Sequence, residues 1–366
     1  MKSIRIIFIL FFFIDGCIDP LPVRILKQEP KLVVDGSITN EPGPYQVRLS
    51  FSTDLAQSVE KRLPATNASV WIIDDAGESE MLTEVAAGVY ETNAGGMRGE
   101  IGRAYNIRII LSSEKEYYSL PQKMAPSGTI ENIYTEFERN ALNGDEPARP
   151  QDAVNVFIDS HGSGDEASFF RWRWTAVYHG RTYPELRTKG LPGGATIPDP
   201  PACSGWIYDR GELLRVGDCT CCSCWPYEYN SVAILSDPRF TSDNFFRKVQ
   251  VAQIPVVPMR FHDKYYLELE QISLSEDAFK FWALVKAQHE SAGSLFQPSA
   301  VKVTGNIRAL DSDERALGVF EVSAITRRSF FVTQDVLPDP LPPIEQIAED
   351  CTLVYTNGTN QKPTFW

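Results

Sequence analysis

The sequence predicts a mainly β protein, in which an N-terminal β-sandwich is followed by a larger mainly β domain that contains one amphipathic helix. Three observations support this prediction. Most apolar residues lie in short runs that alternate with polar residues or are rich in β-branched and aromatic side chains, as in half-buried strands. Clusters of Gly, Pro, Asn and Asp separate these runs. One longer segment instead has apolar residues at intervals of three and four, which is typical of a helix.

The first domain is expected over residues 31–122. Strand-like runs include Leu32–Val34, Tyr45–Leu49 and Tyr105–Ile109, and the turn-type cluster Asn40–Pro44 lies between the first two. The order of strands and turns resembles Ig-like or prealbumin-like sandwich modules. This resemblance implies two antiparallel sheets packed face to face.

The second domain is expected over residues 130–366, after a hinge candidate at Pro121–Gly128. It has several runs dominated by β-branched and aromatic residues, among them Val154–Ile158, Phe169–Trp174 and Tyr265–Glu270. This domain is therefore also predicted to be mainly β.

One helix and one long insertion interrupt these strands. The helix is expected over Ser273–Glu290, where Ser273 and Glu276 have capping-box spacing. Its apolar face is formed by Ala278, Phe281, Trp282 and Val285. An insertion rich in Gly, Pro and Cys spans about 187–230. A loop of this length inside a domain is usually functional or held by covalent links.

The N-terminus has the pattern of a bacterial lipoprotein. Lys2 and Arg5 precede the apolar run Ile6–Ile14, which is about half as long as the roughly 20 residues of a membrane-spanning helix. The run ends at Gly16 and Cys17, in a segment that resembles a lipobox. Residues 1–16 are therefore expected to be a signal peptide. Cys17 is expected to carry the lipid, and residues 17–30 to form a tether.

Composition and motifs argue against several classes of function. The formal charge of −13 becomes −14 when the signal peptide removes two cations and one anion, and an acidic surface disfavours nucleic acid. The four histidines lack metal-binding spacing, and neither a nucleophile elbow nor a phosphate loop occurs. Glu268 and Glu270 lie on the same face of a predicted strand. Acidic and apolar residues alternate there, which favours a solvated face over a catalytic pair of carboxylates. We expect a non-enzyme without cofactor or metal site.

Six cysteines follow Cys17 in this exported chain, and all six are disulfide candidates: Cys203, Cys219, Cys221, Cys222, Cys224 and Cys351. An even number in an exported protein favours disulfides, although the sequence does not determine their pairing. A zinc–thiolate cluster and free thiols are the alternatives. Zinc sites usually separate their ligand pairs more widely than the cluster at 219–224 does.

Aromatic residues flank the cysteine cluster, and they form the candidate recognition surface: Trp206, Tyr208, Trp225, Tyr227 and Tyr229. Exposed aromatic rings bind sugars or partner proteins without any reactive group. The alternative is that these rings pack the insertion onto the sheet.

Segments along nearly the whole chain carry a family resemblance: Cys17–Pro20, Lys31–Gly36, Ile38–Pro44, Tyr266–Ser275, Gly293–Phe296, Gly305–Ile307, Leu317–Phe320 and Lys362–Trp366. Together they resemble the Bacteroidota outer-membrane lipoprotein family called domain of unknown function 4249. The resemblance implies no catalytic residues for this chain. Members commonly occur beside genes for TonB-dependent outer-membrane receptors, which implies an accessory role in binding or uptake.

Two classes of function follow from these expectations. The first is a lipid-anchored outer-membrane binding protein that captures a ligand or covers a TonB-dependent receptor. The second is a structural or adhesion lipoprotein that makes only protein–protein contacts. The sequence names neither the ligand nor the face of the membrane that carries the protein.

Overall fold

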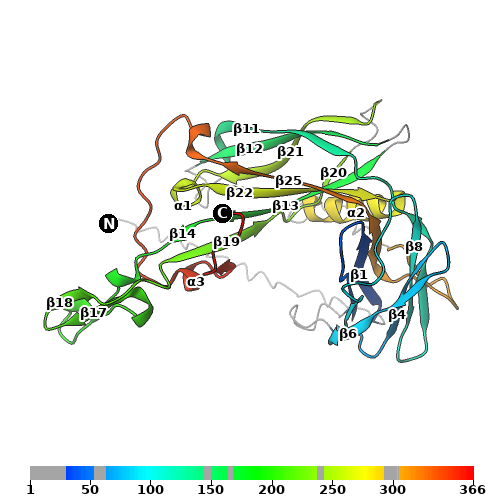
Figure 1. The fold of residues 1–366 in the computed structure, drawn as a ribbon, viewed down its shortest axis with the longest axis horizontal. Helices are drawn as coiled ribbons and strands as arrows, with labels where there is room; N and C mark the ends of the chain where they lie inside the picture. The colour runs from blue at the N-terminus through cyan, green and yellow to red at the C-terminus, as the bar shows by residue number, and fades with distance from the viewer. Residues whose placement is uncertain are drawn as a thin grey trace, which may run out of the picture.

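A computed structural model describes residues 30–52, 63–142, 150–163, 168–236, 243–291, 303 and 305–366. The expected signal peptide, Cys17 and nearly all of the tether lie outside these ranges. The fold is mainly β, as the sequence predicts (Figure 1). Among the described residues, no helix is both long and apolar enough to span a membrane.

The sandwich consists of two six-stranded sheets. The first has the order β24 (Leu317–Ser323), β1 (Leu32–Thr39), β2 (Gln46–Phe51), β7 (Val89–Glu91) and β6 (Thr83–Ala86), with β3 (Leu63–Pro64) on β2. The second has the order β23 (Ile307–Ala309), β9 (Glu116–Ser119), β8 (Ala104–Ile110), β4 (Ser69–Asp74) and β5 (Ser79–Met81), with β10 (Gln122–Lys123) on β8. Alternate residues of both sheets fill one apolar core, as the period of two requires.

Two strands of the sandwich come from late in the chain. β24 pairs in parallel with β1, from Val33 opposite Leu317 to Thr39 opposite Ser323, and β23 pairs with β9. Phe320 of β24 is fully buried in the sandwich core. The sequence-based division, which placed all of 130–366 in the second domain, was therefore wrong for these strands. The sandwich is thus built from two parts of the chain that are far apart in the sequence.

The rest of the chain forms a two-layered part that we call the body. Its larger sheet has the order β14 (Gly180–Arg181), β19 (Ser223–Tyr229), β13 (Phe169–Tyr178), β22 (Tyr265–Leu274) and β25 (Ile325–Val332), with β20 (Ile234–Leu235) on β13 and β26 (Gly358–Thr359) on β19. The smaller sheet has the order β11 (Thr129–Leu142), β12 (Gln151–His161) and β21 (Phe245–Pro255). The shared core contains Trp172, Phe170 and Phe261. Three short helical segments, α1 (Pro258–Phe261), η4 (Gln334–Val336) and α3 (Cys351–Val354), border it.

The amphipathic helix is α2 (Glu276–Ser291), and it packs where the body meets β24. The predicted capping box was wrong, because Ser273 is the penultimate residue of β22 and its hydroxyl donates to the Ala125 carbonyl. The Ser275 hydroxyl instead accepts from the Ala278 backbone N–H at 3.2 Å. Helix period alone could not separate the end of a strand from the cap of the helix that follows it.

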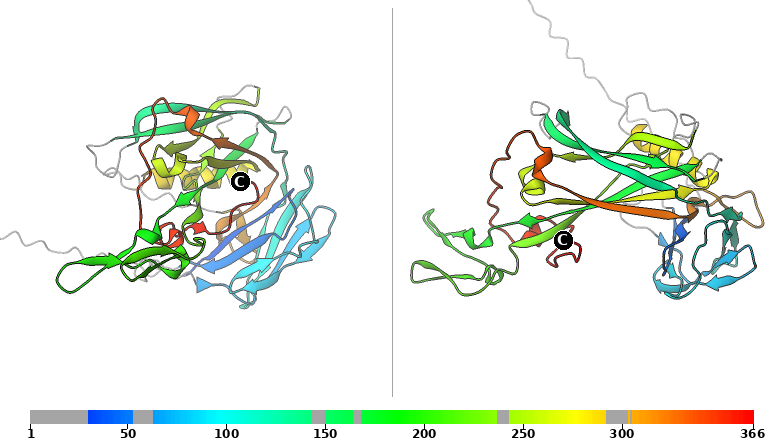
Figure 2. Two further views of the ribbon diagram at one scale, coloured as in Figure 1. Left: turned by 60° about the vertical axis from the view of Figure 1, so that its left-hand side comes forward. Right: turned by 45° about the horizontal axis from the view of Figure 1, so that its top comes forward.

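The molecule is elongated, with the sandwich at one end and a hairpin arm at the other (Figures 1 and 2). The body lies between them. Its larger sheet has one face on the smaller sheet, and its other face is turned toward the side on which the arm and the sandwich project.

Candidate functional site

The Cys-rich insertion folds into the arm, which we define as residues 184–222. It contains η1 (Pro184–Leu186), β15 (Thr188–Gly190), β16 (Thr196–Pro198), η2 (Ala202–Ser204), β17 (Trp206–Asp209) and β18 (Glu212–Arg215). Arg210 and Gly211 join β17 to β18 with φ of 49° and 91°, the positive values that a two-residue type I′ turn requires. The arm is shorter than the predicted insertion at 187–230, because β19 belongs to the sheet of the body.

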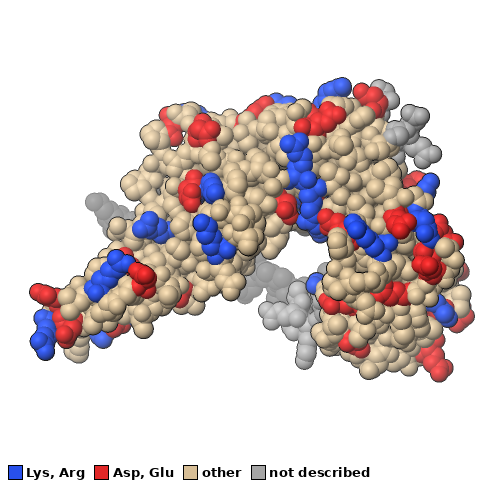
Figure 3. Space-filling model, in the orientation of Figure 1, with Lys and Arg blue, Asp and Glu red and all other residues tan. Residues whose placement is uncertain are grey.

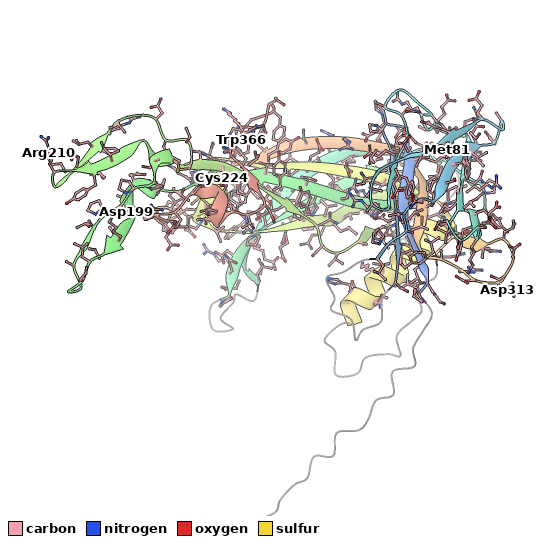
Figure 4. All side chains as sticks on the ribbon, turned by 90° about the horizontal axis from the view of Figure 1, so that it is seen from below. Met81, Asp199, Arg210, Cys224, Asp313 and Trp366 are labelled. Carbon is pink, nitrogen blue, oxygen red and sulfur yellow. A yellow bond between two sulfur atoms is a disulfide. The ribbon has the colours of Figure 1, made fainter. Side chains whose placement is uncertain are left out.

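Three disulfides pair all six cysteines that follow Cys17. Cys203–Cys221 and Cys219–Cys222 lie at the base of the arm, and Cys224–Cys351 joins β19 to α3 across 127 residues of sequence. Figure 4 shows Cys224 between the arm and the sandwich. The Cys203 and Cys221 sulfurs lie near a carboxylate oxygen of Asp350, but they are bonded to each other and so neither is a thiolate ligand. The two arm disulfides thus cross-link the arm internally, next to the point at which the chain returns to β19 of the body.

Apolar side chains are exposed along the arm. Of the sixteen large exposed hydrophobic residues in the described ranges, the arm holds six: Leu186, Leu191, Ile207, Tyr208, Leu214 and Val216. Val216 is the most exposed of these at 63%. Ile207 and Leu214 lie directly opposite each other in the β17–β18 hairpin. Figure 4 shows Arg210 at the far end of this hairpin, so these side chains lie on a part of the arm that projects from the body.

The five predicted recognition aromatics do not form one surface. Trp206 and Tyr208 lie on β17 of the arm, whereas Trp225, Tyr227 and Tyr229 alternate along one face of β19. Trp225 is 9% exposed, and its ring stacks on His179 with centres 5.4 Å apart. Tyr229 is 63% exposed. Trp225 therefore packs the sheet, while Tyr208 and Tyr229 remain accessible at separate places.

The C-terminal residues cover part of the same sheet face, which the sequence reasoning missed. Phe365 stacks on Tyr266 with ring centres 4.0 Å apart, and Trp366 meets Phe331 edge-on at 6.0 Å. Trp366, labelled in Figure 4, also packs against the cluster of Val177, Trp225 and Tyr266 on this face. The alternation in Tyr265–Glu270 puts Tyr266 on the outer face, but no local pattern tells which segment covers that face.

A polar pocket, the junction pocket, lies where the sandwich meets the body. The outward-facing residues Asp35, Ser37 and Thr39 of β1 line it, together with Gln46 and Arg48 of β2 and Glu321 and Ser323 of β24. The body contributes Arg171 and Arg173 of β13, Ile272, Ile325 and Trp282 of α2. Figure 3 shows basic and acidic side chains together at this junction. Sequence alternation could have placed these residues outside the two cores, but not opposite each other.

The wall of the junction pocket is built on a nearly buried ion pair. The Arg171 guanidinium lies 3.1 Å from the nearer carboxylate oxygen of Glu321, and the Trp282 indole N–H donates to the other oxygen at 2.9 Å. Burial lowers the pKa of Arg171, and the charge of Glu321 opposes this effect. An ion pair with so little exposure depends on each partner to compensate the other.

A charged belt continues from this pocket along the outer face of the body. Arg173 and Arg327 both form ion pairs with Glu270, and Arg327 also reaches Glu41 of the sandwich at 2.6 Å. Glu270 is only 7% exposed, so the expectation of a solvated face was wrong at this position. The hydrogen bond and ion pair with Arg327 lower the pKa of Glu41. The belt holds charged groups in fixed places on either side of the junction.

The comparisons with known proteins agree with the resemblance seen in the sequence at the level of the family. No curated protein matches the chain. A family model matches residues 18–329, which is most of the chain. The matched residues include the sandwich with β23 and β24, the arm and most of the body, whereas the end of β25, η4, α3 and β26 follow the matched range. The chain belongs to the family described as a domain of unknown function (DUF4249).

Proposed function

We propose that this chain is a lipid-anchored, non-catalytic accessory binding protein of the outer membrane, docked through its arm to a TonB-dependent receptor in ligand capture or uptake. The observation that carries the proposal is the arm itself. It projects from the body, two disulfides hold its base, and it exposes six large apolar side chains.

Exposed apolar side chains at this density are typical of protein–protein contact sites. Water makes isolated apolar surface unfavourable, so a soluble segment with no partner would be expected to bury or replace such residues. A covalently fixed base also lowers the conformational entropy that binding must remove. Apolar anchors on a rigid hairpin are therefore well suited to fill pockets on a partner protein.

The proposed anchor determines what the arm can reach. A lipid on Cys17 would hold the protein at the membrane surface, where two or three acyl chains give stable attachment. Tethering in the membrane plane raises the effective concentration of any membrane partner. An integral receptor is thus the partner class that the anchor favours.

Cys17→Ser tests the anchor. We expect the variant to leave the membrane fraction and to lack the mass of the lipid on its N-terminal peptide, as measured by fractionation and mass spectrometry. A variant that stays in the membrane with the same peptide mass as wild type would rule out this mode of attachment.

Ile207→Ser combined with Leu214→Ser tests the docking surface. Affinity purification from native membranes should recover a receptor barrel with the wild-type chain and much less of it with the variant. Val85→Ser combined with Ile101→Ser is the matched control, because these residues are also exposed but lie in the sandwich. Equal recovery with both double variants would refute docking through the arm. Recovery of other envelope proteins without a receptor would instead support the structural or adhesion role.

A further inference from the structure

The junction pocket has the position and size of a site for a small ligand. It lies between two domains, where binding pockets commonly form, and its volume is about 280 Å³. This is just below the usual range of about 300–1,000 Å³ for ligand sites, so an amino acid or a dipeptide would fill it. Its walls come from β1, β2 and β24 of the sandwich and from β13 and α2 of the body.

Buried polar atoms in the pocket wall favour a polar occupant. Only four buried side-chain nitrogen or oxygen atoms among the described residues lack a hydrogen-bond partner. Two of them, Arg171 Nε and Ser323 Oγ, belong to residues that line this pocket. Because buried polar groups are nearly always satisfied in folded proteins, their concentration at one cavity is unusual.

When the paired charges of the lining are set aside, one cation and one anion remain. Arg171 and Glu321 neutralise each other, and Arg173 is paired with Glu270. Asp35 and Arg48 are direct neighbours across β1 and β2, yet neither forms an ion pair with any described residue. Cross-strand neighbours of opposite charge normally attract each other. Both line the cavity, and because the Arg48 Nε–H donates to Gln46 Oε1 at 2.7 Å, the terminal nitrogens of its guanidinium are left for a further partner.

We propose that the junction pocket binds a small zwitterion, a free amino acid or a dipeptide. Arg48 holds its carboxylate, because a guanidinium matches a carboxylate with two parallel hydrogen bonds. Asp35 holds its ammonium group. The two carboxylates of the lining disfavour a multiply charged anion such as phosphate. The Arg171 guanidinium lies 4.0 Å from the centre of the Trp282 ring and covers it, which leaves little ring surface for a sugar to stack on.

Calorimetric titration of the full-length protein in detergent tests the proposal with a matched set of probes. Glycylglycine carries both charges, N-acetylglycine only the carboxylate, and glycinamide only the ammonium group. We expect glycylglycine to bind, and we expect the affinity for each singly charged probe to be lower by a factor of about ten or more. This factor corresponds to the loss of one charge-assisted contact. Inorganic phosphate and glucose should not compete.

Two variants assign the contacts. Arg48→Ala should weaken glycylglycine binding about tenfold or more, and Asp35→Asn should remove the preference for glycylglycine over N-acetylglycine. Both residues are exposed, so the fold should persist, and thermal unfolding checks this. Arg210→Ala in the arm is the matched control, since the Arg210 side chain is 93% exposed and far from the pocket. This variant should bind glycylglycine with the wild-type affinity.

No binding of glycylglycine at millimolar concentration would overturn the proposal, as would tighter binding of phosphate or glucose. Equal affinity for glycylglycine and N-acetylglycine would refute the role of Asp35. These results do not depend on receptor docking, because the probes are titrated into the isolated protein. Ligand binding in the junction pocket and receptor docking through the arm can thus be refuted independently.

Discussion

The guanidinium of Arg171 lies 4.0 Å from the centre of the Trp282 ring while it forms an ion pair with Glu321. Arg171 comes from the body, Trp282 from helix α2, and Glu321 from a strand of the sandwich. A cation on an aromatic face is worth more when both groups are removed from water. This cluster therefore links the two domains and the helix at one point.

Glu321→Leu is predicted to destabilise the fold by about 3–5 kcal/mol, because it leaves the Arg171 charge buried without its partner. Urea unfolding measures the loss. The double variant Arg171→Leu with Glu321→Leu should recover most of it, since replacing both members of a buried pair is far less costly than removing one. If the double variant is as unstable as the single one, the ion pair is not the source of the effect.

The disulfides are predicted to contribute very unequally. Removing Cys224–Cys351 by a double substitution to Ala opens a loop of 127 residues and should cost about 4–5 kcal/mol. Removing Cys219–Cys222, whose cysteines are three residues apart, should cost about 1–2 kcal/mol on the same scale. Thermal unfolding of the two variants gives the comparison. An equal loss from both would contradict an effect of loop length.

Substitutions at the start of helix α2 are predicted to distinguish the capping residue Ser275 from Ser273, which belongs to the preceding strand. Ser275→Ala should cost about 1 kcal/mol, the usual value for losing an N-cap hydroxyl. Ser273→Ala should cost about 1–3 kcal/mol for a different reason, since Ser273 is buried and its hydroxyl joins Ala125 to Ala324. Circular dichroism should show fraying of the helix only in the first variant. Fraying in the second would restore the capping box predicted from the sequence.

Acid is predicted to weaken the fold through His179. Burial and then the neighbouring His262 lower the pKa of His179, so the unfolded chain binds this proton more readily than the folded one. The stability associated with neutral His179 is complete above the ordinary value of about 6.5 and falls as the pH drops from there toward the lowered folded pKa. Urea unfolding at a series of pH values should show that the unfolding free energy of His179→Gln depends less steeply on pH than that of the wild-type protein. His289→Gln, at an exposed position of α2, is the control and should keep the wild-type slope.

Local patterns in the sequence predicted the fold class, the amphipathic helix and the position of the cysteine-rich insertion. These features depend on residues that are close in the chain. The pairings of Val33 with Leu317 and of Ile307 with Ser119 do not, and they bring two strands of the expected second domain into the sandwich. The junction pocket was missed for the same reason. Arg171 and Arg173 alternate with buried aromatics in Phe169–Trp174, which shows that they face away from the core, but only tertiary structure sets Asp35 and Arg48 opposite them.

The accessory binding role depends above all on contact between the arm and a membrane receptor. Site-specific photocrosslinking in intact cells measures that contact, with p-benzoylphenylalanine placed at Tyr208 in the arm and, for comparison, at Met81 in the sandwich. We predict one crosslinked receptor barrel from position 208 and none from position 81. Crosslinks to the receptor from position 81 alone, or none from either position, would contradict the proposed docking.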